Sequence, residues 1–153
     1  MRLLLCAVGQ RMPAWVDAGV EEYRKRMPRE SRLELRPVAA ADRRRGDAKR
    51  WKHEEAERLR QAAGGAHGVA LDLSGRGWST EQLSARMDDW RMGGRDVAFF
   101  VGGADGLDAS LLAASDERWS LSALTLPHAV VRIVVAEQLY RAWTLLSGHP
   151  YHR

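Results

Sequence analysis

Short apolar runs alternate with longer amphipathic segments along the whole chain, and this alternation restricts the fold more than any other feature. Apolar runs of strand length predict strands at 3–8, 33–38, 69–73, 96–101 and 119–121. Helical periodicity predicts helices after Pro13, over 47–63, from Ser79 or Thr80, over 109–114 and from Pro127 onward. Repeated strand–helix units are typical of a parallel sheet with helices on both faces. We therefore expect one Rossmann-like α/β domain over residues 1–153.

The single cysteine lies inside the first apolar run. Cys6 has no partner for an internal disulfide, so we expect a buried thiol and a reducing cytoplasm as the compartment. The longest apolar stretch, 127–146, is interrupted by Arg132, Glu137 and Arg141, and no run approaches the roughly 20 residues that cross a bilayer. The first ten residues lack a signal-peptide cleavage site and fit a strand better. No membrane association is expected.

Positive charge is concentrated between residues 24 and 60. This segment holds 14 Lys and Arg against 7 Asp and Glu, whereas the whole chain has a formal net charge of only +4. Such a segment attracts polyanions, and contacts with phosphates make binding depend on salt. Charge alone leaves two interpretations, a nucleic-acid surface or a solvated charged helix.

Common catalytic and cofactor motifs are missing from the sequence. It contains no phosphate-binding loop, no Gly-x-Ser-x-Gly elbow, no His-Glu-x-x-His pair and no cysteine cluster, so neither a metal site nor a dinucleotide site is predicted. A glycine-rich turn, 102–106, does follow the fourth predicted strand. It permits close backbone approach to a ligand at the carboxyl end of a buried strand, although a plain tight turn explains it equally well.

Three loops that follow predicted strands should meet at one edge of the sheet: 71–75, the glycine turn and 121–128. The segment SGRGWS, 74–79, is predicted to be the turn after the third strand. The loop LSALTLPH, 121–128, is unusually apolar for a connection in solvent. Leucine side chains around a flat adenine ring account for it, and so does burial in the core.

The last predicted helix is apolar on nearly every side, and a domain this small has little core left to cover it. Its apolar residues are Val130, Val131, Ile133, Val134, Val135, Leu139, Tyr140, Trp143, Leu145 and Leu146. We expect a second copy of the chain to cover part of this helix, and hence a homodimer.

Five segments together carry a resemblance to a known family. They are LLLCAVGQRMPAWVDAGVEEY, LDLSGRGWS, FFVGGADGL, WSLSALTLPHAVVRIVVAEQLYRAW and the ending HPYHR. In this order and length the chain resembles the RlmH family of SPOUT methyltransferases, which methylate N3 of a pseudouridine in bacterial 23S rRNA. The likeness covers essentially the whole chain, and the last two segments are its most distinctive parts.

The resemblance implies a fold, a cofactor and partners. It implies a trefoil knot in the C-terminal half, S-adenosylmethionine bent inside that knot, and 23S rRNA in the ribosome as the substrate. It also implies a homodimer in which the last helices pack together and the C-terminal tail of one subunit helps to form an active site. The residues expected to bind the cofactor are Leu71, Gly102, Leu121, Ser122, Ala123, Leu124, Thr125 and Leu126.

Five residues are candidates for the chemistry. The N3 imide is protonated at neutral pH, and His128 and His152 have the side chain that suits proton transfer in this range. Arg132, one helical turn after His128, would stabilise negative charge on a uracil oxygen or bind a phosphate. In the tail, Tyr151 would stack on a base while Arg153 meets phosphate or base oxygens.

Other charged residues have two interpretations each. Glu137 and Arg141 form an i, i+4 pair that is as consistent with structure as with catalysis. Asp72 and Asp105 would meet ribose hydroxyls or the sulfonium charge, or else stabilise their own turns.

Two further functions are compatible with the sequence. One is a SPOUT methyltransferase that acts on transfer RNA. The other is a non-catalytic protein that binds RNA or the ribosome and keeps the fold without the cofactor. A test of cofactor binding distinguishes the methyltransferase from the non-catalytic protein. The kind of RNA that receives the labelled methyl group distinguishes an rRNA enzyme from a transfer RNA enzyme.

Overall fold

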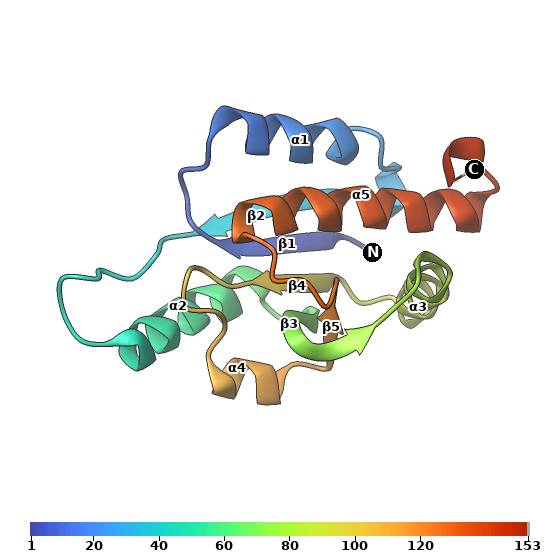
Figure 1. Ribbon diagram of the computed structural model, residues 1–153. Coiled ribbons are helices and arrows are strands. Elements are labelled where there is room, and N and C mark those ends of the chain that lie inside the picture. The colour runs from blue at the N-terminus through green and yellow to red at the C-terminus, as the bar shows by residue number, and fades with distance from the viewer. Residues whose placement is uncertain (153) are drawn as a thin grey trace.

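The strands form a single parallel sheet. The computed structural model describes residues 1–152, and its five-stranded sheet has the order β2-β1-β4-β3-β5 (Figure 1). The strands are β1 (Leu3–Val8), β2 (Leu33–Val38), β3 (His67–Gly77), β4 (Val97–Val101) and β5 (Glu117–Ser120). The helices are α1 (Ala14–Arg24), α2 (Ala48–Ala63), α3 (Thr80–Gly93), α4 (Ala109–Ala114) and α5 (His128–Ser147), with short 3-10 helices η1 (Arg29–Ser31) and η2 (Pro150–His152). The predicted α/β fold with a parallel sheet is confirmed.

Helices cover both faces of the sheet, as predicted. Alternate residues of a strand point to opposite faces, so β1 contributes to two separate cores. Leu3 and Leu5 pack with residues of α1, α3 and α5, whereas Leu4 and Cys6 pack with residues of α2 and α4. In Figure 1, α1 and α5 lie above the sheet and α2 and α4 lie below it. Burial of β1 on both faces explains why it reads as a continuous apolar run.

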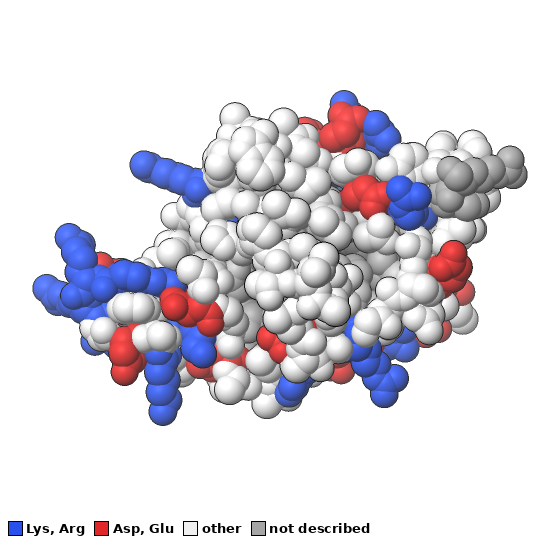
Figure 2. Space-filling view, viewed as in Figure 1, with Lys and Arg blue, Asp and Glu red and all other residues white. Residues whose placement is uncertain are grey.

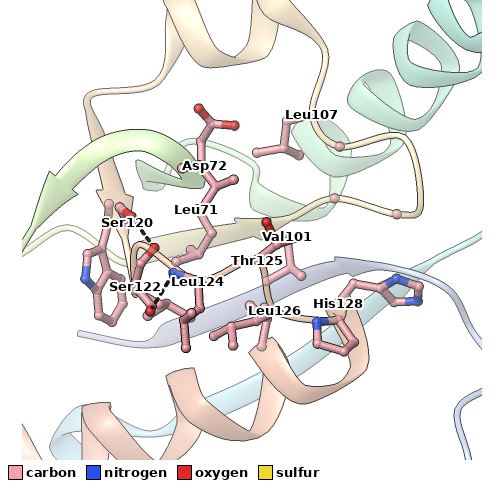
Figure 3. A pocket seen from close by; sticks show the side chains of 18 of the residues that line it. Leu71, Asp72, Val101, Leu107, Ser120, Ser122, Leu124, Thr125, Leu126 and His128 are labelled. Carbon is pink, nitrogen blue, oxygen red and sulfur yellow. Dashed lines mark hydrogen bonds between the residues drawn. The ribbon is translucent and has the colours of Figure 1, made fainter.

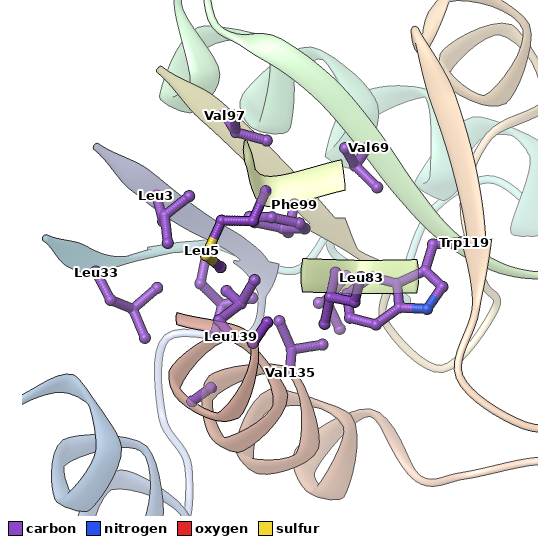
Figure 4. Close-up of a cluster of buried hydrophobic side chains, with 14 of the residues drawn as sticks. Leu3, Leu5, Leu33, Val69, Leu83, Val97, Phe99, Trp119, Val135 and Leu139 are labelled. Carbon is purple, nitrogen blue, oxygen red and sulfur yellow. The ribbon is translucent and has the colours of Figure 1, made fainter. Parts of the chain in front are cut away.

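The core under α3 and α5 contains large side chains from all five strands (Figure 4). Phe99 of β4 and Trp119 of β5 meet edge to face with ring centroids 6.1 Å apart, and Trp78 stacks on Trp119 at 5.3 Å. Leu139 of α5 is fully buried against this cluster. A buried side chain of this size contributes roughly 1.5–3 kcal/mol to stability. The middle of α5 is therefore held firmly against the sheet.

Local capping residues set the ends of two helices where the sequence predicted them. Ser79 precedes α3, accepts a hydrogen bond from the Gln82 backbone N–H at 3.1 Å, and donates its own backbone N–H to the Gln82 side chain at 2.9 Å. This reciprocal pair is a capping box. Gly64 follows the last residue of α2 with a positive φ of 58°, and so ends that helix.

The prediction that residues 74–79 form a turn is wrong for residues 74–77. β3 continues to Gly77 and pairs with β5 again at Arg76 and Gly77, after an irregularity that begins beyond Leu71. Gly75 permits this second stretch of pairing, since a Cβ there would lie 2.6 Å from the backbone nitrogen of Trp119. Glycine composition suggested a turn, whereas the glycine is needed for close approach of two strands.

The Cys6 thiol should be unreactive in the folded protein. Cys6 is fully buried in β1, and burial raises the pKa of its thiol to about 12. Because the thiolate is the reactive form, we expect labelling by a disulfide reagent at pH 8 to be roughly a thousandfold slower than in concentrated guanidinium chloride. Rapid labelling of the native protein would instead show that β1 opens locally.

Candidate functional site

A cavity of about 540 Å³ opens at the carboxyl edge of the sheet, where β3, β4 and β5 end (Figure 3). This volume lies in the range of small-molecule sites. The lining comes from the strand ends, the glycine turn, the loop before α5 and the first turn of α5: Leu71, Asp72, Leu73, Val101, Gly102, Gly103, Ala104, Gly106, Leu107, Trp119, Ser120, Leu121, Ser122, Leu124, Thr125, Leu126, Pro127, His128 and Val131. The three segments predicted to meet at one edge do so, although 71–75 is part of β3 rather than a loop.

The cavity includes most of the residues expected to bind the cofactor. Seven of them line it: Leu71, Gly102, Leu121, Ser122, Leu124, Thr125 and Leu126. Ala123 belongs to the same loop and is exposed, but it is not part of the lining. Leu107, Trp119 and Val131 also line the cavity and were not predicted from the sequence. Leu107 directly follows the glycine turn, and Val131 lies three residues after His128 on α5. Both could have been predicted from their position next to segments expected at the cavity.

Two serines hold the apolar loop that precedes α5. The Ser120 hydroxyl donates to the backbone oxygen of Ser122 at 3.1 Å, and the Ser122 hydroxyl accepts from the Leu124 N–H at 2.9 Å (Figure 3). These local bonds fix a tight conformation in which the Leu124 side chain is 71% exposed. Exposure of a leucine at the mouth of a cavity gives apolar surface for a ligand to cover.

The glycine turn after β4 requires glycine for steric reasons. A Cβ on Gly102 would lie 2.7 Å from the backbone carbon of Gly106 and 2.9 Å from its oxygen. Gly106 itself has a φ of 81° and donates its N–H to the Gly103 oxygen at 3.1 Å. The chain thus doubles back on itself at the floor of the cavity, with backbone rather than side chains facing a ligand.

Asp105, in the same turn, has a partner distant in the sequence. Its carboxylate accepts a hydrogen bond from Arg43 Nη2 at 2.8 Å, and Arg43 Nη1 donates to Glu55 at 2.6 Å. Glu55 is only 2% exposed and also accepts the Ala41 backbone N–H at 2.9 Å. Of the two interpretations of Asp105, this network supports stabilisation of the turn.

Two titratable side chains line the cavity, Asp72 and His128. Asp72 follows Leu71 in β3, and its carboxylate accepts the Ser74 backbone N–H at 3.1 Å and the Ser74 hydroxyl. His128 is the first residue of α5 and is half-buried. The two side chains come from different elements (Figure 3), so the cavity offers one acidic group and one group able to exchange a proton. Within residues 1–152, no three His, Cys, Asp or Glu side chains group as metal ligands.

Arg132 does not line the cavity. It is 1% exposed, and its Nη2 donates to the backbone oxygens of Val8 at 3.0 Å and Gly9 at 2.7 Å. Burial lowers the pKa of this guanidinium, an effect that the charge of Asp17 partly offsets. Its Nε has no hydrogen-bond partner among the described residues. The guanidinium ties α5 to the end of β1, a placement that favours a structural role over the predicted contact with substrate.

Replacing Arg132 with methionine should destabilise the fold. The change removes two charge-assisted hydrogen bonds and leaves two backbone oxygens with fewer donors, which we expect to cost about 2 kcal/mol in the free energy of unfolding. Urea denaturation measures this loss, and Arg132→Lys should recover part of it by supplying one donor. If Arg132→Met were as stable as the wild type but inactive, the guanidinium would instead have a catalytic role.

The C-terminal tail folds back on the far end of α5. The Tyr151 ring lies edge to face on Tyr140 with centroids 4.6 Å apart, and the Arg141 guanidinium lies 4.9 Å from the centre of the Tyr151 ring. The Tyr151 hydroxyl donates to Glu137 at 3.3 Å, and burial raises its pKa to about 12. Glu137 also accepts from Arg141 at 2.6 Å, so this pair holds the tail. The His152 side chain and Arg153, both predicted to act in catalysis, lie outside the described residues.

The tail and the cavity are at opposite ends of the same helix. The cavity lies at the start of α5, whereas η2 follows its end and folds back so that Tyr151 contacts Glu137, Tyr140 and Arg141 (Figure 1). At 1.5 Å per residue, Glu137 lies about 14 Å along the helix axis from His128. Tyr151 is not among the residues that line the cavity of its own chain.

Comparison with known proteins gives one family. Residues 1–152 match the family model described as "Predicted SPOUT methyltransferase". "Ribosomal RNA large subunit methyltransferase H" of Hahella chejuensis (strain KCTC 2396) is 52% identical over 155 residues, which cover 100% of this chain and 99% of that protein. The protein of the same name in Acidithiobacillus ferrooxidans (strain ATCC 53993 / BNL-5-31) is 54% identical over 155 residues, with 100% and 98% covered.

Solved structures share the fold at much lower identity. A structure from Haemophilus influenzae Rd KW20, described as a probable methylase family protein, has a TM-score of 0.58 and 12% sequence identity. The alignment covers 99% of this chain and 70% of that one. At this identity the likeness concerns the arrangement of helices and strands alone.

Proposed function

Because this chain belongs to the SPOUT methyltransferase family, we propose that it transfers a methyl group from S-adenosylmethionine to N3 of a pseudouridine in 23S ribosomal RNA. The single observation that carries the proposal is the apolar cavity at the carboxyl edge of the sheet. Relatives with about half of their residues identical over the full length are named as ribosomal RNA large subunit methyltransferases, which supports the choice of substrate.

The cavity residues fit this cofactor. The leucines at 121, 124 and 126 offer apolar surface for an adenine ring, and the backbone of the loop offers N–H and C=O groups for its edge. Gly102 and Gly103 leave room for close approach at the cavity floor. The carboxylate of Asp72 suits a ligand that carries positive charge. When bound, S-adenosylmethionine supplies a methyl group that is already electrophilic.

The residues of the chain then mainly have to align the reaction and manage one proton. Alignment and exclusion of water by the loop and the turn contribute much of the rate. The N3 proton of the base must leave, and His128 is the titratable base at the start of α5 beside the cavity. His152, in the tail, is the second candidate for this role. Both assignments are part of the proposal.

A homodimer completes the proposed site. Val130, Val134 and Leu145 of α5 stay only half-buried in the single chain, and Leu146 is 40% exposed, so α5 keeps an apolar face for a second copy. Antiparallel pairing of two α5 helices would bring the tail of one subunit toward the cavity of the other. We include the trefoil knot and a cytoplasmic location in the same proposal, on the strength of the family and the substrate.

Two measurements test the proposed function. Calorimetry should detect S-adenosylmethionine binding to the purified protein, and no binding at millimolar cofactor would leave only a non-catalytic function. Transfer of labelled methyl groups should then be compared on assembled ribosomes, free rRNA and transfer RNA. We expect label in N3-methylpseudouridine of 23S rRNA, and label in transfer RNA alone would overturn the choice of substrate.

A further inference from the structure

The structure neutralises most of the positive charge in segment 24–60. Nine of its 14 basic residues make ion pairs with carboxylates: Arg24, Lys25, Arg26, Arg32, Arg36, Arg43, Arg44, Arg50 and Arg60. Arg58 donates to a backbone oxygen. Within the described part of the chain, the four without such partners are Arg29, Arg45, Lys49 and Lys52. Free positive charge is therefore far more localised than the sequence suggests.

Three of these four cations lie together around the start of α2. Arg45, Lys49 and Lys52 fall within eight consecutive positions, and we call them the α2 basic patch. Figure 2 shows the corresponding gathering of blue side chains at the left of the view, over the first turn of α2 and the loop before it. The highly exposed Arg44 adjoins the patch, although Asp42 pairs with it.

This arrangement is electrostatically unfavourable in the free protein. The amino end of a helix carries partial positive charge, and acidic residues usually stabilise it. The first turn of α2 contains no acidic residue but does contain Lys49 and Arg50; Asp47 caps the helix and Glu54 pairs with Arg50, whereas Arg45, Lys49 and Lys52 have no carboxylate partner among the described residues. Cations that repel one another and the helix end are stabilised when an anion binds among them.

The patch is also fixed relative to the cavity. Arg43, two residues before Arg45, joins the buried Glu55 of α2 to Asp105 of the glycine turn. The Arg43 guanidinium lies 5.0 Å from the centre of the Trp51 ring, and Trp51 Nε1 donates to the Arg45 backbone oxygen at 2.5 Å. The loop before α2 is thus bonded to the glycine turn in the free protein. This lowers the entropic cost of ordering the loop when a partner binds.

We propose that the α2 basic patch binds phosphates of the RNA substrate and sets the distance between that RNA and the cavity. The proposal rests on the proposed function and deepens it, because it assigns a specific contact surface to the substrate. Phosphate contacts position a nucleic acid without reading its sequence, which suits a surface beside an active site. Arg43 acts as a positioning residue, since it holds the patch and the glycine turn in one frame.

The test is direct binding to ribosomes as salt is varied. The triple variant R45A/K49A/K52A is compared with the wild type by cosedimentation with ribosomes from a bacterial strain that lacks this modification. Log affinity falls as log salt rises, and each lost phosphate contact makes this slope less steep by about 0.9. We therefore expect the slope of the triple variant to be less steep by about 2–3. Affinity near physiological salt should fall roughly ten- to a hundredfold. S-adenosylmethionine binding should not change.

The matched control removes three exposed cations elsewhere on the chain. R29A/R95A/R118A changes the net charge equally and touches neither the patch nor the cavity lining. An equal loss of affinity in both triple variants would show a general charge effect and overturn the proposal, as would wild-type affinity and slope in R45A/K49A/K52A. Loss of cofactor binding in that variant would also overturn it by showing a structural role. Failure of the proposed function has a different signature, a wild-type protein that binds no cofactor or labels no ribosomal RNA.

Discussion

Removal of the residues after Ser147 is expected to lower methyl transfer to ribosomes by at least about a hundredfold, because the proposed site loses the groups that align the base. The truncated chain keeps the whole cavity, so its affinity for S-adenosylmethionine should stay within about threefold of the wild type. Loss of the Tyr151 ring from Tyr140 should cost only about 1 kcal/mol in the free energy of unfolding. Single-turnover transfer, calorimetry and urea denaturation measure the three effects.

A mixing experiment shows which subunit uses the tail. The truncated chain has a cavity but no tail, and the Gly102→Ala chain has a tail but an impaired cavity. Coexpressed with different affinity tags, the two should form mixed dimers in which one site is complete, and random pairing restores about a quarter of wild-type activity. No recovery in purified mixed dimers would contradict exchange of the tail between subunits.

Tyr151→Phe is the control for the truncation. This variant keeps the ring on Tyr140 and beneath Arg141, and loses only the 3.3 Å hydrogen bond to Glu137. A bond of this kind contributes about 1 kcal/mol, so we expect transfer to fall by less than about tenfold. A full loss in Tyr151→Phe would assign the effect of truncation to the hydroxyl rather than to the tail as a whole.

Most of the fold could be predicted because its signals are local. Apolar runs and helical periodicity located all five strands and the five longer helices, and capping residues such as Ser79 and Gly64 set helix ends within a residue or two. The extension of β3 to Gly77 could not be predicted this way. It depends on close approach of β5, about 40 residues later in the chain, and nothing near Gly75 in the sequence indicates that contact.

In the candidate site, too, local features could be predicted and contacts between distant residues could not. The segments that line the cavity could be predicted from strand ends and from the likeness to a family, although 71–75 belongs to β3 rather than to a loop. The partners of individual charged side chains could not be predicted from the sequence. Arg132 bonds to the end of β1, Asp105 pairs with Arg43, and both contacts join residues more than 60 positions apart. Charge at one position in a sequence indicates a need for a partner, whereas the fold alone decides which partner meets it.

Gly102→Ala should impair the cofactor site more than any other single methyl group added to the glycine turn. The added Cβ would lie 2.7 Å from the Gly106 carbon, closer than real Cβ contacts allow, and its neighbours are backbone atoms that cannot rotate away. Overpacking of this kind costs roughly 1–3 kcal/mol, and moving the turn into the cavity relieves it. That energy corresponds to about a ten- to hundredfold weaker binding of S-adenosylmethionine, measured by calorimetry.

The matched control adds the same methyl group where space is open. A Cβ on Gly93, at the end of α3, meets no atom within 4 Å, and the residue has no positive φ. Gly93→Ala should therefore bind the cofactor as the wild type does and be slightly more stable, since alanine loses less chain entropy on folding. Cofactor affinity of Gly102→Ala within twofold of Gly93→Ala would show that the glycine turn does not form the wall of the cofactor site. S-adenosylmethionine would then be bound by the loop 121–128 and α5 without a contribution from the turn.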